Sequence, residues 1–353
     1  MYVELMQFSA ILLMSLLALK LFLLPRNTIT SDAVRISRWF LFIGTSLLAI
    51  QFLLQYILGL RARGVTLAVM LNLAVFIPCT SFFSLAVLYL QRKGQVNYLE
   101  RYIGVPVWFL AMGIIAIGIM TDNLLTTEII ATGLYAAMQL FYTARQMRYM
   151  RHLRETLANY YDADMDYVLR WMEWSVIQLT LMAVMVPVII FGHGLLLAIF
   201  ALLFFFGIFY LVDSFCLFVV SNTPAKVVEA ETGQNETEPE ERVSDDACNR
   251  VEQAVDVWVS KGGHLKAGLN MPGAAEEIGV PRYLLSCWLR QKGVRYSDWL
   301  AEMRIDEAKR VLRDHPDWSN ETVAEHCGFS DRTYFQRKFK EITGMTPHDF
   351  LNL

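Results

Sequence analysis

Near the end of the chain stands the stretch SNETVAEHCGFSDRTYFQRKFKEI, residues 319–342. It predicts a helix, a tight turn and a second helix. Ser319 or Asn320 suits the cap of the first helix, and Gly328 suits the left-handed backbone of a sharp turn. We expect Ser330 to cap the second helix. The pattern is typical of a helix-turn-helix unit.

The predicted second helix has two unlike faces. Phe335, Phe339 and Ile342 recur at helical spacing and form an apolar stripe. The opposite face, at about 100° per residue, is polar and basic, which suits a DNA major groove. The alternative is an amphipathic helix pair whose basic side chains are merely solvated. The residues of the polar face are Thr333, Gln336, Arg337 and Lys340.

A second copy of the pattern lies upstream and favours the DNA-binding interpretation. Its Leu285 and Leu289 correspond to Phe335 and Phe339, each 50 positions later. An amphipathic stretch, 297–312, joins the two units. The opposite face of the upstream helix carries Tyr283, Ser286, Cys287 and Arg290. We therefore expect two helix-turn-helix units in one domain.

The last 100 residues or so resemble the AraC/XylS family of bacterial transcription regulators. The motifs that carry the resemblance are PRYL (281–284), YSDWL (296–300), MRIDEAKRVL (303–312), GFSD (328–331), YFQRKFK (334–340) and GMTP (344–347). The resemblance implies two helix-turn-helix motifs bridged by a linker helix. It also implies a homodimer, and two recognition helices in successive major-groove turns of double-stranded DNA.

The same resemblance assigns base-reading positions. They are Tyr283, Ser286 and Cys287 in the first recognition helix and Arg332, Thr333, Gln336 and Arg337 in the second. Cys287 departs from the family, in which a longer polar side chain is common at this place. The family's late Arg after the Thr-Pro motif is also absent from this chain.

The rest of the chain is far more apolar. Of the 353 residues, 55% are hydrophobic and 18% charged, and the long apolar runs end at Val220. Each run is long enough to form a helix that crosses about 30 Å of hydrocarbon, which favours membrane spans. The less favoured alternative is that the runs form the buried helical core of a soluble protein. The runs are 5–24, 39–60, 66–90, 102–121, 124–143, 175–192 and 195–220. The predicted fold is all-α: a polytopic seven-helix transmembrane bundle followed by a soluble AraC-type domain.

An acidic, polar segment, 221–244, separates the two parts and is predicted to be a flexible linker. The predicted DNA-binding domain, 245–353, holds 15 Lys and Arg against 17 Asp and Glu. We therefore expect modest non-specific affinity for DNA, because that affinity comes mainly from phosphate neutralisation.

Basic residues predict the orientation of the spans. If the N-terminus lies outside, the inner loops hold 11 Lys and Arg and the outer loops hold 2, Arg61 and Arg63. An odd number of spans then places the DNA-binding domain in the cytoplasm. The predicted location is the inner membrane of a bacterium.

The longest inner loop, 145–174, begins with a basic helical face that continues the fifth span. Asp162, Asp164 and Asp166 follow it. We favour a helix bound to anionic lipid headgroups with an acidic turn, and the alternative is an element that couples the membrane part to the soluble domain. The loop lacks the Gly and Glu of a calcium-binding EF-hand, so no metal is expected there.

Two acidic residues fall inside predicted spans: Asp213 in the seventh and Glu128 in the fifth. Buried charge in a membrane is costly and usually functional, so both are candidates for a signal-sensing or inter-helix site. The alternative for Asp213 is that it reaches the interface or accepts a hydrogen bond from a nearby hydroxyl.

The sequence contains no catalytic motif, and no catalytic residue, metal or cofactor is expected. The main hypothesis is a membrane-tethered transcription regulator whose membrane helices sense an unknown ligand or membrane partner. One alternative is that the helices only anchor a constitutive DNA-binding domain in the lipid bilayer. Another is an intramembrane transporter or enzyme with an attached regulatory domain.

Overall fold

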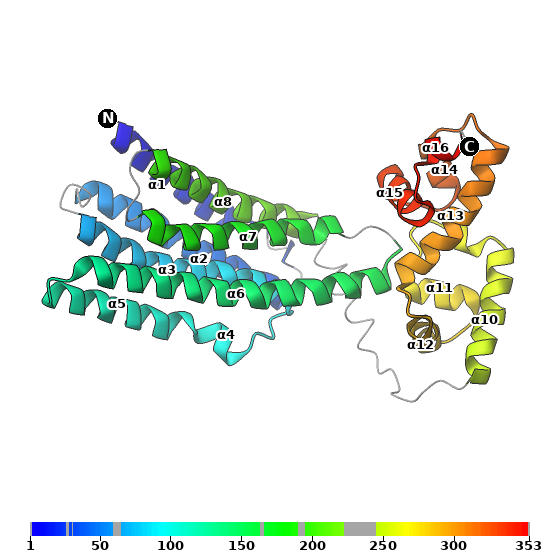
Figure 1. Cartoon of the computed structure of the whole chain (residues 1–353), viewed down its shortest axis with the longest axis horizontal. Helices are drawn as coiled ribbons and strands as arrows, with labels where there is room; N and C mark the ends of the chain where they lie inside the picture. Colours follow the sequence, from blue (N-terminus) through cyan, green and yellow to red (C-terminus); the bar gives the residue numbers. More distant parts are fainter. Residues whose placement is uncertain are drawn as a thin grey trace. The chain divides into compact units, whose positions relative to one another are not determined.

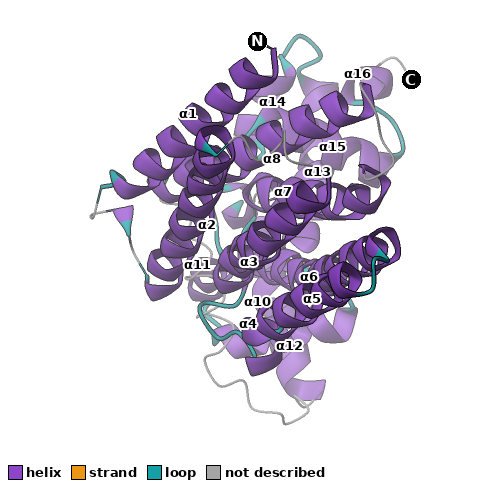
Figure 2. Ribbon diagram, turned by 90° about the vertical axis from the view of Figure 1, so that its left-hand side faces the viewer, coloured by secondary structure: helices purple, strands orange, loops and turns teal. Residues whose placement is uncertain are grey.

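The computed structural model describes residues 2–25, 28–29, 31–58, 65–162, 166–189, 195–221 and 245–351. It divides into two compact units, and helices make up both of them (Figure 2). The first unit contains residues 1–151 and 168–225. The second contains residues 152–167 and 226–353. No strand occurs among the described residues, which confirms the predicted all-α class.

Long helices that lie alongside one another build the first unit (Figure 1). They are α1 (Tyr2–Phe22), α2 (Asp32–Ile57), α3 (Val65–Gln91), α5 (Gly104–Met120), α6 (Leu124–Tyr160), α7 (Asp166–Ile189) and α8 (Leu195–Val220). The short α4 (Tyr98–Tyr102) precedes α5. Helix α2 packs against both α1 and α3, α3 packs against α5, and α1 packs against α8.

Five helical stretches in the described part of the chain are long and apolar enough to cross a membrane. They are Asp32–Ile57, Leu71–Gln91, Tyr98–Met120, Leu124–Tyr160 and Ile199–Val220. The apolar stretch Gln7–Phe22 is shorter, and α7 is not one of the five. A helix covers most of each of the seven predicted ranges, but the number of spans stays a prediction. Arg61, Arg63, Asp164 and nearly all of the predicted linker lie outside the described residues.

A buried carboxylate organises one end of the first unit. The Glu100 side chain is 1% exposed and accepts hydrogen bonds from Arg145 Nε at 2.5 Å and Tyr149 Oη at 3.0 Å. Arg92 Nη1 lies 3.2 Å from its other oxygen, and the Asn97 amide caps α4 through the same oxygen at 3.3 Å. The prediction that the basic face of α6 meets lipid headgroups is therefore wrong for Arg145, because a long-range ion pair outweighs that local pattern.

The second unit carries the predicted domain. Its helices are α10 (Asp245–Ser260), α11 (Met271–Ile278), α12 (Arg282–Lys292), α13 (Tyr296–Asp314), α14 (Asn320–His326), α15 (Arg332–Thr343) and α16 (Pro347–Leu351), with the 3-10 turn η3 (Gly263–Leu265). Two apolar cores lie in this unit. The first joins α10, α11 and α12, and the second joins α14 and α15.

Helix α13 belongs to both cores. Trp299 and Leu300, near its start, pack into the first core. Ile305 and Ala308, farther along, pack into the second. The linker helix expected at 297–312 is therefore the element that holds the two helix-turn-helix units together.

Candidate nucleic-acid interface

The second helix-turn-helix unit consists of α14, a turn and α15. Ser319 Oγ accepts a hydrogen bond from the Thr322 amide at 3.1 Å and caps α14, as the sequence predicts. The predicted cap of α15 is wrong. Asp331, and not Ser330, is the N-cap, because its Oδ1 accepts from the Tyr334 amide at 2.7 Å.

Gly328 makes the turn between these helices. Its φ is +78°, in the left-handed region that favours glycine. A Cβ at this position would lie 2.3 Å from the Leu265 carbonyl oxygen, which is backbone and cannot give way easily. The turn of the second helix-turn-helix unit thus packs closely against η3, which precedes the first helix-turn-helix unit.

Helix α15 has a buried aromatic face. Phe335 and Phe339 are 0% exposed, as predicted, and their ring centroids lie 5.8 Å apart. Phe329 packs on Phe335 with a centroid distance of 5.3 Å. Ile342, which the periodicity places in this stripe, is instead 36% exposed, and Tyr334 is buried in the core. The second core therefore lies nearer the start of α15 than the sequence pattern indicates.

The opposite face of α15 is open. Arg332, Thr333, Arg337 and Lys340 are exposed and Gln336 is half-buried. The Arg337 guanidinium carbon lies 5.5 Å from the centre of the Tyr334 ring, so a buried aromatic supports this side chain from below. All five predicted side chains of this helix thus share one accessible, polar surface.

Lys338, a further basic residue of α15, does not share this surface. Its side chain is 10% exposed and lies 2.7 Å from Asp298 Oδ1 on α13 and 3.0 Å from Glu341 Oε2. Burial raises the pKa of Asp298, but the ion pairs with Lys338 and Arg295 outweigh burial and hold this pKa below its usual range. Lys338 therefore joins α15 to α13 and does not face outward.

The first helix-turn-helix unit has the same arrangement of helices, but its predicted reading face is less basic. Helix α11 ends at Gly279, which has φ +80°, and α12 follows after Pro281, whose position at the N-cap provides no side-chain cap. Leu285 and Leu289 are buried as predicted. The predicted reading face has two exposed residues, Tyr283 and Arg290, and two half-buried ones, Ser286 and Cys287.

The two acidic candidates for a signal-sensing or inter-helix site lie in the first compact unit and differ in their surroundings. Asp213 on α8 pairs with Lys20, in the last turn of α1. The two side chains are 31% and 45% exposed. Glu128 on α6 is 4% exposed. The structure does not bring these two residues into one described site.

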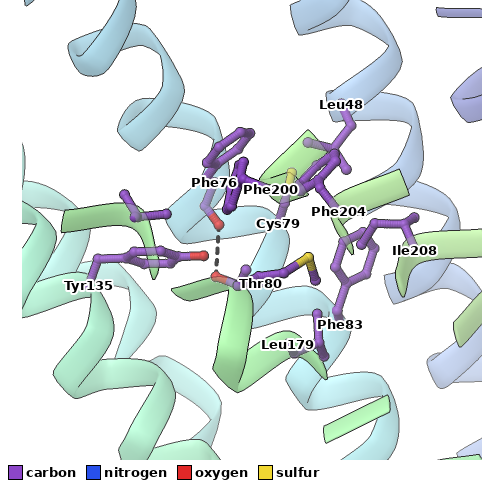
Figure 3. Close-up of a pocket in the computed structure, with 12 residues that line it drawn as sticks. Leu48, Phe76, Cys79, Thr80, Phe83, Tyr135, Leu179, Phe200, Phe204 and Ile208 are labelled. Carbon is purple, nitrogen blue, oxygen red and sulfur yellow. Dashed lines mark hydrogen bonds between the residues drawn. The ribbon is translucent and has the colours of Figure 1, made fainter. Parts of the chain in front are cut away.

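A small pocket lies between α2, α3, α6, α7 and α8 in the same unit (Figure 3). Its lining is mainly apolar and aromatic. Cys79 Sγ lies 3.4 Å from the Gly44 carbonyl oxygen, and Thr80 Oγ1 donates to the Phe76 carbonyl at 2.8 Å. In Figure 3 the hydroxyl of Tyr135 points toward Thr80. Sequence reasoning missed this pocket, because each helix contributes only a few residues to it.

Comparison with known proteins agrees with the geometry of the second unit. The family described as "Helix-turn-helix domain" matches residues 274–352. This match begins within α11 and ends just after α16, so it contains most of the first helix-turn-helix unit, the linker helix and the second unit. The C-terminal part of the chain is an AraC-type helix-turn-helix domain.

Several curated proteins are similar to part of this chain. The HTH-type transcriptional regulator YobQ of Bacillus subtilis is 36% identical over 93 residues, which cover 25% of this chain and 37% of YobQ. The HTH-type transcriptional activator RhaR of Yersinia pestis is 35% identical over 71 residues, which cover 20% of this chain and 24% of RhaR. Regulatory protein PocR of Salmonella typhimurium is 27% identical over 88 residues, which cover 25% of this chain and 29% of PocR.

The chain thus spans between about a quarter and about two fifths of the length of these relatives. No solved structure matches the chain. The family match, residues 274–352, lies in the C-terminal domain and does not include the apolar helices of the first compact unit.

Proposed function

We propose that this protein is a membrane-tethered transcription regulator that binds specific DNA sequences and responds to a signal through its membrane helices. The observation that carries the proposal is the exposed polar and basic face of α15, held on a core of fully buried Phe side chains. A rigid helix with this surface suits the major groove.

The reading roles follow from side-chain chemistry. Arg337 suits the two acceptors of guanine, and Gln336 suits the donor and acceptor of adenine. Arg332 and Thr333, in the first turn of α15, contact neighbouring bases, while Lys340 contacts phosphate. Tyr283, Ser286, Cys287 and Arg290 of α12 form the second contact, one major-groove turn away. A homodimer adds further half-sites on the DNA.

The membrane location is supported by the five apolar helices and by the bias of basic residues toward one set of loops. With the N-terminus outside, the DNA-binding domain lies on the cytoplasmic face of a bacterial inner membrane. DNA is in that compartment, so orientation and function agree.

Buried polar contacts favour a sensing role over a bare anchor. Gln51 and Gln55 of α2 both donate to Asn72 Oδ1 of α3, at 2.7 and 2.9 Å. Ser84 of α3 lies 3.1 Å from Gln139 Oε1 of α6. A single helix would suffice to anchor a domain, whereas these contacts join several helices into one defined bundle, as a sensing domain requires.

The test is a footprint of the full-length protein in lipid nanodiscs, on genomic fragments that the protein itself selects. We expect two protected patches about 34 Å apart, one turn of the major groove. The double variant Arg332→Ala, Arg337→Ala should lose them. A matched control, Lys309→Ala with Arg310→Ala, removes the same charge from α13 and should keep them.

Other outcomes separate the roles. Protection of a single patch would mean that α12 packs without reading bases. Equal loss in both double variants would mean that net charge, and not base contact, drives binding. A folded full-length protein that protects no fragment at low salt would contradict the proposed function.

A further inference from the structure

Asp162 occupies a buried site in the second unit. It follows the end of α6 and its side chain is 4% exposed. Its Oδ2 accepts two hydrogen bonds, from Arg304 Nη2 at 2.9 Å and from the Leu269 amide at 3.0 Å. The bonds join residues that are 142 and 107 positions apart, so they belong to the tertiary structure and not to a local turn.

Arg304 forms the centre of this site. Its side chain is 1% exposed, in the middle of α13. Its Nε donates to the His264 carbonyl at 2.8 Å, and its Nη2 also donates to the Lys266 carbonyl at 2.7 Å. Carbonyls satisfy hydrogen bonds but do not neutralise the charge. Asp162 supplies the counter-charge, which a buried guanidinium needs.

The site lies where the two helix-turn-helix units meet. Arg304 stands between Leu300, which packs in the first core, and Ile305, which packs in the second. Its guanidinium carbon lies 5.7 Å from the centre of the Phe329 ring, in the turn of the second unit. Leu269 precedes α11 of the first unit. A carboxylate bound here therefore touches both units at their shared linker helix.

The segment that carries Asp162 has its own buried face. Leu153, Leu157 and Tyr160 are 1%, 2% and 5% exposed and follow the spacing of one helix face. These residues belong to the same compact unit as the DNA-binding domain. They are also the last turns of α6, which runs without a break from Leu124.

We propose that the end of α6 and Asp162 form a docking element through which the membrane helices act on the DNA-binding domain, with Arg304 and the Leu269 amide as its receptor. Because α6 runs without a break from Leu124 to Tyr160, a shift of its first part also moves its end and Asp162, which follows it. Movement of Asp162 displaces Arg304, which lies between the two helix-turn-helix units, and so alters the spacing of α12 and α15. The proposal rests on the proposed function and replaces our sequence preference for a lipid-bound acidic turn at this residue.

The test compares full-length wild type, Asp162→Asn and Asp306→Asn in lipid nanodiscs. Asn keeps the size of Asp but removes its charge. Asp306 is the matched control, because it is a 73% exposed carboxylate that pairs with Lys309 on α13. Amide exchange in the peptide that contains Leu269 should quicken roughly ten-fold or more in Asp162→Asn and stay unchanged in Asp306→Asn.

The same proteins are then titrated with the selected DNA. The affinity of Asp162→Asn should fall roughly five-fold or more, because the two recognition helices lose their fixed spacing. Unchanged exchange would refute the contact. Faster exchange with equal or higher DNA affinity would refute the coupling. Failure of the proposed function looks different: no protein, wild type included, would bind DNA, while the exchange difference would remain.

Discussion

The two helix-turn-helix units follow one plan but have different surfaces. The predicted reading face of α15 carries three basic side chains, Arg332, Arg337 and Lys340, over a core of Phe rings. That of α12 carries one, Arg290, over a core of Leu and Trp. Helix α15 has a side-chain cap and α12 has none. Equivalent folds thus carry unlike surfaces: α15 presents the more basic face, and α12 presents a face with a single basic side chain.

The largest expected effect separates the two cores. Phe335→Ala should lower the free energy of unfolding of the second unit by about 3–5 kcal/mol, because Phe335 is fully buried. Leu285→Ala is its counterpart in the first core. Amide exchange of full-length protein should quicken mainly in α14 and α15 for the first variant, and mainly in α11 and α12 for the second. Equal loss across both units would show that they unfold together.

The next effect compares the reading faces. Arg337→Ala should weaken binding to the selected site by about 1–3 kcal/mol and relax its base preference, since a bidentate contact is lost. Arg290→Ala should cost less. Binding is measured on the selected site and on random DNA at one salt concentration. An equal loss of Arg337→Ala on both DNAs would contradict base reading.

Capping predicts a smaller difference. Asp331→Ala should destabilise the second unit by about 1 kcal/mol, because the Tyr334 amide loses its acceptor. Ser330→Ala is the matched control and should change little, since its side chain does not cap α15. Thermal unfolding curves, together with amide exchange measured in α15, distinguish the two variants. A larger effect of Ser330→Ala would restore the cap predicted from the sequence.

The smallest effect concerns pH. The ion pair with Lys338 helps to hold the folded-state pKa of Asp298 below its usual range. The pair therefore stabilises the fold at pH values above the unfolded-state pKa, about 4, and this stabilisation is lost as the pH falls from there through the folded-state pKa. We expect a contribution of about 1 kcal/mol or less. Asp298→Asn should flatten that part of the stability profile. An identical acid transition in wild type and variant would mean that the pair adds nothing to the attachment of α15.

The apolar helices of the first compact unit show what sequence patterns alone cannot predict. Their apolar runs predict where helices lie, because length and composition are local properties. They do not predict that Glu100 gathers Arg92 and Arg145, or that Asp213 meets Lys20. Such pairs depend on which helices become neighbours, and a uniformly apolar helix carries little information about its partners.

Local sequence patterns predict the all-α class, the helix-turn-helix pattern and the polar face of α15, because helix periodicity and turn glycines act over a few residues. Other features depend on long-range packing: Lys338 turns inward to Asp298, Ile342 lies outside the core, and Asp162 pairs with Arg304, 142 positions away. The physical reason is that local pattern sets which face of a helix is apolar. The burial of a charge, in contrast, depends on a counter-charge that packing brings from elsewhere in the chain.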